Sequence, residues 1–358
     1  MFSTVVRFVL AGSLAMATWG FLPPQPRHTL AGSRIDVPWD AAAGSLLPTI
    51  TVLPNGNFVV TDPDYAIGPS VQVGAVYLFS GETGEVISRL TGSQAYDRVG
   101  TTITVLANGN FVIQSGYWRN GSAMNAGAVT WASAVTGVTG TVSALNSFVG
   151  VTTGDEVGVN VYACGNRGVV PLANGDFVIC SPHWDAPGVA NAGAVTFVDG
   201  QVGITGTPSI DNSVIGSTAN DYVGMTATAL TNSRVVLSTI FWDNGGQTDV
   251  GAVTWTDGTP GLTGTIALSN SLVGSAAGNQ IGNRVVALSD GDYLVVSPGW
   301  DNGPLTEVGA VTRVAGDQPV TGVVTTTNSL TGAAANHQIG AGGVTVLTNG
   351  NYVVKSPY

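Results

Sequence analysis

The sequence predicts an all-β protein made of tandem four-stranded repeats, and three observations lead to this prediction. The tripeptide Gly-Ala-Val recurs at steps of 53, 66, 58 and 58 residues, beginning at Gly74, Gly127, Gly193, Gly251 and Gly309. A second marker, the glycine of Asn-Gly-Asn-Phe and its variants, keeps step with it at Gly56, Gly109, Gly175, Gly291 and Gly350. The chain also contains 50 glycines, and only 9% of its residues are charged, which favours turns and strands over helices. A period of about 58 residues indicates one structural unit per copy.

Each copy is expected to contain four strands in a fixed order. The first alternates apolar and polar residues, so that Ile103 and Val105 share one face. An Asn-Gly pair follows, which suits a tight hairpin turn because both residues tolerate positive φ. The second strand is a nearly continuous apolar run, as expected of a strand buried on both faces. In the second copy the four strands are expected within residues 102–109, 110–116, 127–131 and 139–147.

The repeats are expected to form a β-propeller, because four short strands per unit are typical of a propeller blade. The C-terminal residues 342–358 supply two strands of a sixth unit. The N-terminal segment 18–44 is expected to complete that unit and close a six-bladed ring, because residues 28–33 resemble the end of a unit at 270–275. Consecutive prolines in this segment oppose a strand there. An open β-repeat array is the alternative, while a β-solenoid or a β-sandwich fits the repeats less well.

The N-terminus has the features of an export signal. One cation, Arg7, precedes an apolar run from Phe8 to Ala17 that ends in a small-residue cleavage pattern. Residues 1–17 are therefore expected to be a signal peptide, ahead of the segment 18–44 and the repeat domain 45–358. A buried first strand, an arbitrary start of the reading frame and a single membrane anchor are the alternatives. An extracellular or cell-surface location follows from the signal peptide.

The net charge restricts the class of partner. The formal net charge is −11, and the eleven Lys and Arg residues are scattered along the chain. Without a basic stripe, nucleic-acid binding is not expected, and an anionic membrane surface would repel the chain. No membrane insertion is expected beyond an N-terminal signal or anchor. The expected partner is a protein or a glycan.

Both cysteines lie in the third copy, which is longer than the others. The step of 66 residues exceeds the usual 58, and the extra residues fall around 161–168. Cys164 lies in this insertion, and Cys180 ends the buried strand that follows it. A disulfide between them would pin the insertion to its own repeat. Alternatively, Cys180 is simply a small core residue.

The first copy, residues 55–85, resembles the FG-GAP repeats of integrin-type β-propellers in its strand, loop and Gly-Ala-Val-Tyr-Leu-Phe pattern. Later copies resemble repeats of large bacterial surface or secreted proteins. The resemblance covers about residues 45–358 and implies a propeller fold. FG-GAP blades often bind calcium through an Asp-rich loop. The corresponding loop here lacks the spaced carboxylates that six to eight oxygen ligands require, so neither calcium nor another cofactor is predicted.

One aromatic position recurs before the Gly-Ala-Val strand. Large rings at a repeated position are expected to fill the space between repeats. The alternative is one exposed ring per repeat that stacks on sugars, so that weak sites combine into avidity. The candidate ligand-binding tryptophans are Trp118, Trp184, Trp242 and Trp300.

An aspartate follows three of these tryptophans, at Asp185, Asp243 and Asp301. Asp and Asn side chains readily close turns, which is the favoured interpretation. A shallow cation site is the alternative, although one carboxylate per loop is a weak ligand set, and no metal site is predicted. Asp97, Asp155 and Asp221 precede Arg-Val-Gly, Glu-Val-Gly and Tyr-Val-Gly, and Gln280 and Gln338 are aligned with them in later copies; all five are interpreted as turn formers.

No catalytic constellation is recognised in the sequence. The paired carboxylates Asp62 and Asp64, and Asp290 and Asp292, suit turns better than a glycosidase site, which needs two carboxyl groups a few ångströms apart. The prediction is a non-catalytic extracellular repeat domain for surface interaction or adhesion. A carbohydrate-binding propeller lectin is the first alternative, and an extracellular polysaccharide hydrolase is the second.

Overall fold

The computed structural model describes residues 6–7, 36–37, 48–159, 161–258 and 260–356. These residues form strands and turns with no helix, and therefore no helix able to span a membrane. Strands β1 (Val6–Arg7) and β2 (Asp36–Val37) pair with each other in antiparallel fashion. The rest of the expected signal peptide and of the segment 18–44 lies outside the described residues.

The first copy shows the repeating unit, an antiparallel meander of four strands. It consists of β3 (Thr49–Val52), β4 (Phe58–Asp62), β5 (Ala75–Phe79) and β6 (Val86–Thr91), hydrogen-bonded in that order. Gly56 lies in the turn between β3 and β4 with a φ of +90°, a conformation that glycine adopts without steric cost. The second strand is buried along its whole length, as its apolar sequence predicts.

The later copies repeat this meander, with the same second strand buried in each complete copy. The second copy contains β7 (Thr102–Val105), β8 (Phe111–Ser115), β9 (Ala128–Ala132) and β11 (Phe148–Val149). The third contains β12 (Val169–Pro171), β13 (Phe177–Ser181), β14 (Ala194–Val198) and β15 (Ser213–Ile215). The fourth contains β16 (Thr226–Ala229), β17 (Val235–Thr239), β18 (Ala252–Thr256) and β20 (Ser271–Val273). The fifth contains β21 (Arg284–Ala287), β22 (Tyr293–Ser297), β23 (Ala310–Val314) and β25 (Leu330–Thr331), and a last hairpin contains β26 (Val344–Val346) and β27 (Tyr352–Val354).

A short strand of the following copy extends three of these sheets. The strands β10 (Gly140–Thr141), β19 (Gly264–Thr265) and β24 (Gly322–Val323) each pair in parallel with the fourth strand of the copy before them. The residue after each short strand then donates its backbone N–H to the same neighbouring strand, as Val142 does to Thr91 O at 3.0 Å. Hydrogen bonds therefore link consecutive copies in addition to the packing of their faces.

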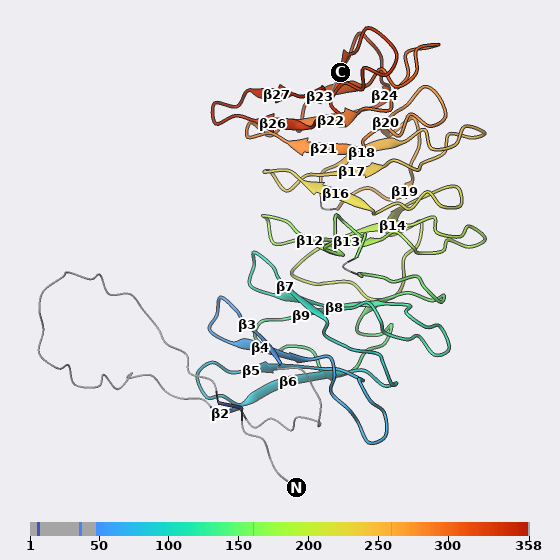
Figure 1. Cartoon of the computed structure of the whole chain (residues 1–358). Coiled ribbons are helices and arrows are strands. Elements are labelled where there is room, and N and C mark those ends of the chain that lie inside the picture. Colours follow the sequence, from blue (N-terminus) through green and yellow to red (C-terminus); the bar gives the residue numbers. More distant parts are fainter. Residues whose placement is uncertain (1–5, 8–35, 38–47, 160, 259, 357–358) are drawn as a thin grey trace, which may run out of the picture.

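The sheets are stacked as an open column. Figure 1 shows the first sheet, with β3 to β6, at one end and the hairpin β26–β27 at the other. The four-stranded repeat is therefore confirmed, and the described sheets adopt the open array rather than a closed ring. The strands expected to close the ring fall in segment 18–44, most of which lies outside the described residues.

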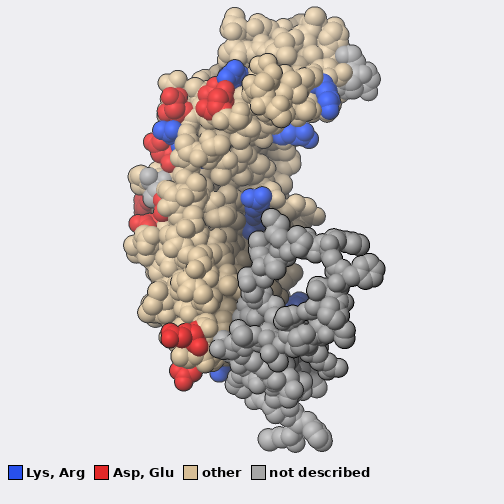
Figure 2. Space-filling model, turned by 90° about the vertical axis from the view of Figure 1, so that its left-hand side faces the viewer, with Lys and Arg blue, Asp and Glu red and all other residues tan. Residues whose placement is uncertain are grey.

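The core lies between neighbouring sheets. One cluster joins Val178 and Val195 of the third copy to Val235 and Leu237 of the fourth, and all four side chains are fully buried. Each sheet thus covers the apolar face of the next, as in repeat proteins whose units cannot bury enough surface alone. Figure 2 shows a largely uncharged face on this column, with acidic side chains along one edge.

Candidate functional site

The four candidate tryptophans are buried in the column. Their relative exposures are 4% for Trp118 and 3% for Trp184, Trp242 and Trp300. A ring with so little exposed area offers no face to a sugar, so the interpretation of one exposed, sugar-stacking ring per repeat is wrong for these four positions. Each indole Nε1 is also buried without a hydrogen-bond partner among the described residues.

The aspartates that follow the tryptophans close their own loops. Each Oδ1 accepts a hydrogen bond from the backbone N–H six residues later, at 2.7 to 2.8 Å. The three pairs are Asp185 with Asn191, Asp243 with Asp249, and Asp301 with Glu307. Within the part of the chain that the structure describes, no group of three or more His, Cys, Asp or Glu residues is arranged to hold a metal ion.

A second set of carboxylates joins consecutive copies. Asp221 is 1% exposed, and its Oδ2 accepts the N–H groups of Ser217 and Thr218 at 2.7 and 2.9 Å. Its Oδ1 accepts the N–H of Asp243 in the next copy at 3.2 Å. Asp97 and Asp155 make the same contacts with Arg119 and Asp185.

The equivalent residue in the fourth copy is Asn279, and in the fifth copy it is His337. Asn279 Oδ1 accepts the N–H groups of Ser275 and Ala276, and His337 Nδ1 accepts that of Ala333. The alignment of Gln280 and Gln338 with the aspartates was therefore wrong by one residue. Asn279 Nδ2 is left without a partner among the described residues, because an amide nitrogen cannot accept the N–H that a carboxylate accepts at this place.

The third copy contains a groove of about 930 Å³ beside its Trp-Asp loop. Trp184 and Asp185 line it, together with residues of the loops that follow β11 and β15 and Thr265 of the fourth copy. Its apolar lining comes from Val151, Pro187, Val189, Pro208, Ile210 and Ile215. Two of the seven candidate ligand-binding residues therefore lie at one concave site, and this groove is the candidate functional site.

The sequence of the third copy explains why the groove forms there. Pro208 occupies the position that Val142 has in the second copy and Ile266 has in the fourth. In each of the three copies this residue comes four positions before an asparagine whose side chain closes a turn, at Asn146, Asn212 and Asn270. Proline has no N–H to donate to the preceding copy, and the parallel ladder is reduced to one bridge between Phe148 and Gly206. The chain therefore leaves the ladder at Pro208.

Few polar groups face this groove. Asp185 carries the only formal charge among the lining residues. Trp184 Nε1 and Thr207 Oγ1 are buried and have no hydrogen-bond partner among the described residues. The unpartnered indole Nε1 is shared with Trp118, Trp242 and Trp300 and is therefore not particular to this groove. The lining thus fits a mainly apolar ligand that has a few hydrogen-bonding groups and no negative charge.

Sequence reasoning missed a row of half-buried side chains along the column. The row takes its residues from two repeated positions in alternation. One position comes directly before the repeated tryptophan, and the other comes directly after the buried aspartate that joins two copies. Glu156 Oε2 lies 2.8 Å from His183 Nδ1, the His183 ring meets Tyr222 edge-on at 5.8 Å, and Tyr222 meets Phe241 at 5.9 Å. The hydrogen bond to Glu156 raises the pKa of His183. The constant spacing of these residues from two repeated markers is the signal that would have revealed the row.

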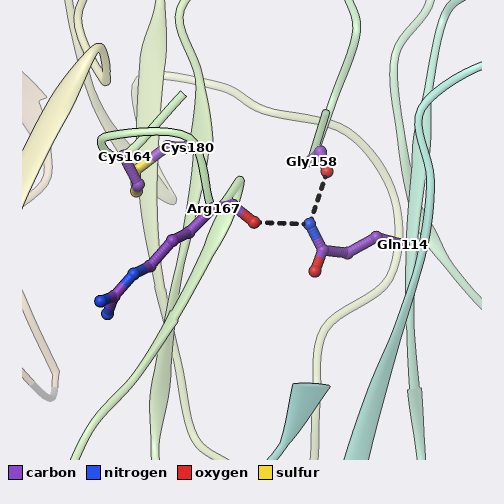
Figure 3. Close-up of a disulfide and its surroundings, with 5 residues drawn as sticks. All are labelled: Gln114, Gly158, Cys164, Arg167 and Cys180. Carbon is purple, nitrogen blue, oxygen red and sulfur yellow. Dashed lines mark hydrogen bonds between the residues drawn. A yellow bond between two sulfur atoms is a disulfide. The ribbon is translucent and has the colours of Figure 1, made fainter. Parts of the chain in front are cut away.

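The insertion of the third copy is held in three ways. Cys164 and Cys180 form the expected disulfide (Figure 3). Gln114 Nε2 donates to Arg167 O at 2.8 Å and to Gly158 O at 2.9 Å, as Figure 3 also shows. Cys164 N and Gly165 N donate to Gly224 O and Met225 O of the link to the next copy. The insertion is thereby fixed between the second and fourth copies.

Three of the four paired carboxylates contact an arginine. Asp290 and Asp292 both contact Arg313, at 2.7 and 3.0 Å. Asp64 contacts Arg98 at 3.3 Å, whereas Asp62 is 1% exposed at the end of β4. Burial raises the pKa of Asp62. Asp62 and Asp64 lie at the end of the buried strand β4, and Asp290 and Asp292 lie just before the buried strand β22. Each pair lies at a turn, as expected.

The fold and its repeated loops define a tandem β-repeat protein with one copy-specific groove. The chain belongs to the family described as a repeat of unknown function (DUF5650), whose matches cover residues 52–101, 105–159, 171–225, 229–283, 287–341 and 346–358. These matches reproduce the repeats that the two sequence markers define. They do not establish FG-GAP identity, which stays a resemblance.

Comparisons beyond the family add little. No curated protein matches the chain. A protein of unknown function from Dyadobacter fermentans is similar over 76% of this chain and 79% of its own, with 13% identity and a TM-score of 0.29. An α-L-arabinanase of Penicillium chrysogenum, solved with arabinobiose, is similar over 87% and 88%, with 14% identity and a TM-score of 0.26. At such low scores neither likeness bears on the function.

Proposed function

We propose that the chain is a non-catalytic interaction module that binds an uncharged, mainly apolar peptide segment of a partner protein in the groove of the third copy. The composition of the lining carries this proposal. Apolar side chains form most of the wall, and Asp185 is the only charged residue in it. Binding sites of this volume are commonly apolar with a few polar groups that fix orientation. The hydroxyl groups of Ser209 and Ser217, which also line the groove, would serve as those groups by binding peptide carbonyl oxygens.

Ile210 offers a direct test because it lines the groove and is exposed. An array of neutral apolar, acidic and basic decapeptides is probed with the wild-type chain and with Ile210→Arg. Neutral apolar peptides are expected to bind, and Ile210→Arg is expected to weaken them at least tenfold. Leu268→Arg is the matched control, since Leu268 has the same place in the fourth copy and a similar exposure, 46% against 53% for Ile210. Equal binding by both variants would contradict the proposal.

A carbohydrate-binding module is the second candidate, because the same serine hydroxyl groups can also bind sugar hydroxyl groups. A glycan array probed with the same three proteins separates the candidates. Sugar binding that Ile210→Arg abolishes, without any peptide binding, would favour the lectin. The mostly apolar wall favours the peptide, since a sugar brings many hydroxyl groups that need partners.

We further propose that the module acts outside the cell or at its surface. The disulfide between Cys164 and Cys180 supports this, because disulfides persist in oxidising compartments. Thiol alkylation of the native protein from culture medium and from cell lysate tests it. The protein is expected in the medium or at the surface with both cysteines blocked from alkylation, and a reduced intracellular pool would overturn this proposal.

A further inference from the structure

A second, polar pocket lies where the first three copies meet, away from the groove. Its volume is about 290 Å³, at the lower end of ligand pockets and suited to one ring-sized group. Arg98 and Tyr117 both line it. Gln114, Thr101 and Gly158 complete the part of the wall that matters here.

Arg98 supplies the charge of this pocket and is the only formally charged residue in its lining. Its Nη2 lies 3.3 Å from Asp64 Oδ1, which is a long contact for an ion pair. Its Nε is buried and has no hydrogen-bond partner among the described residues. The guanidinium group therefore keeps donor capacity that only an added acceptor can satisfy.

Tyr117 supplies a ring face beside this charge. The Arg98 guanidinium carbon lies 5.7 Å from the centroid of the Tyr117 ring. The residue is 46% exposed, in contrast to the buried Trp118 that follows it. An aromatic ring beside a planar cation suits a ligand that has both a flat or ring-shaped body and a carboxylate.

Gln114 and Thr101 form another part of the wall, and this part offers an acceptor. Gln114 is saturated, because its Nε2 donates to two carbonyl groups (Figure 3) and its Oε1 also accepts a hydrogen bond from Thr104 Oγ1 at 3.1 Å. Thr101 Oγ1 donates to Gln114 O at 3.0 Å and keeps lone pairs for a ligand hydroxyl. The other copies carry Thr61, Cys180, Ser238 or Val296 at the position of Gln114, so this wall is particular to the second copy.

We propose that this pocket binds one uronate residue of an acidic polysaccharide. The carboxylate accepts hydrogen bonds from Arg98 Nε and a terminal guanidinium nitrogen, the sugar ring lies against Tyr117, and one hydroxyl donates to Thr101 Oγ1. A neutral sugar would offer the cation hydroxyl oxygens as acceptors but no negative charge. An acidic peptide side chain has the carboxylate but neither the ring for Tyr117 nor the hydroxyl for Thr101. The site and the ligand differ from those of the groove, so this proposal does not depend on the proposed function.

Saturation-transfer NMR on the full chain tests the proposal, with galacturonate, galactose and N-acetylglutamate as separate probes. Galacturonate is expected to bind at least tenfold more tightly than either of the others. Arg98→Gln is expected to abolish this preference. Glutamine is compatible with the fold there, because Gln280 and Gln338 occupy the same place in later copies with the same positive φ.

Two further variants make the result specific. Tyr117→Ala is expected to weaken galacturonate several-fold while leaving the preference over galactose intact. Arg167→Gln is the matched control, because the Arg167 side chain points away from Gln114 (Figure 3). Absence of galacturonate binding, equal binding of galactose, or equal binding of N-acetylglutamate would overturn the proposal. So would binding that Arg98→Gln leaves unchanged.

Discussion

At the scale of residues, the buried aspartates fasten one copy to the next. Asp221 accepts hydrogen bonds from its own loop and from Asp243 N of the following copy. Burial raises the pKa of the equivalent Asp97, although three backbone N–H groups stabilise its charged form. The hydrogen bonds therefore offset a desolvation cost and fix the spacing of the copies.

Asp221→Asn tests this role. The amide would keep one oxygen for the loop but turn an NH₂ group toward Asp243 N–H, as Asn279 does in the next copy. The expected loss is about 1–3 kcal/mol of the free energy of unfolding, since a buried donor loses its acceptor. Denaturant unfolding measures it. Asp211→Asn, at an exposed position of the same copy, is the control, and an equal effect of both variants would contradict this role.

The His183–Glu156 pair predicts a pH dependence of stability. The pKa of His183 is raised above its ordinary value of 6.5, so folding favours the protonated ring. The stabilisation is fully present below 6.5 and is lost as the pH rises through the folded-state pKa. Because both side chains are about one-third exposed, the effect is expected to stay below about 1 kcal/mol.

The free energy of unfolding is measured between pH 5 and pH 9, about two units on either side of neutrality, for the wild type and for Glu156→Gln. The variant is expected to lose the decline in stability near neutral pH. Persistence of that decline in the variant would assign it to another group. His183→Gln provides the complementary control.

Much of the site at this scale was readable from sequence, but not all of it. The repeat showed that the tryptophans and aspartates occupy equivalent positions, and turn chemistry explained Asp185, Asp243 and Asp301. Exposure was not readable, because the same repeated ring can face a neighbouring sheet or water. The row at His183 and Tyr222 was missed because its residues differ between copies, and only position unites them.

At the scale of elements, the hairpin and the buried second strand followed from apolar pattern and Asn-Gly turns. The two-residue parallel strands could not be predicted from the sequence. So short a strand forms only against the neighbouring copy, and two residues have no hydrophobic periodicity. Pro208 is informative here, since it interrupts this pairing and lies at the groove.

Pro208→Val is expected to restore the link between the second and third copies. The new amide of residue 208 should be protected from hydrogen exchange as strongly as that of Val142. Global stability should change little, because a new hydrogen bond of about 0.5–1.5 kcal/mol offsets the added freedom of the unfolded chain, about 0.4–1 kcal/mol. Rapid exchange at residue 208 would show that proline is not what interrupts the ladder.

The disulfide is expected to stabilise the third copy. A closed loop of this length, with a sequence separation of 16 between the two cysteines, restricts the unfolded chain by about 3 kcal/mol. Reduction should lower the unfolding midpoint and speed tryptic cleavage after Arg167. The double variant Cys164→Ser, Cys180→Ser should match the reduced protein and ignore the reductant. A midpoint that reduction leaves unchanged would contradict a stabilising role.

At the scale of the whole molecule, the repeats predicted the four-stranded unit but not its arrangement. Four-stranded units of similar length can close into a ring or continue as a column, and small rotations between neighbouring sheets decide which forms. The clusters that join consecutive copies, such as Val195 with Leu237, fix those rotations through side-chain packing. Such packing is set by three-dimensional contacts that a repeat pattern does not encode.

The central claim is that the copies continue along an open column, and distances between spin labels test it most directly. One label is fixed at Glu82, and the second is placed in turn at Val135, Gln201 and Asp317, which are exposed in equivalent loops of later copies. Neither native cysteine interferes, because both are in the disulfide. The column predicts that pulsed electron paramagnetic resonance gives a distance that increases at every step. A distance to Asp317 shorter than that to Gln201 would indicate a closed ring and contradict the account.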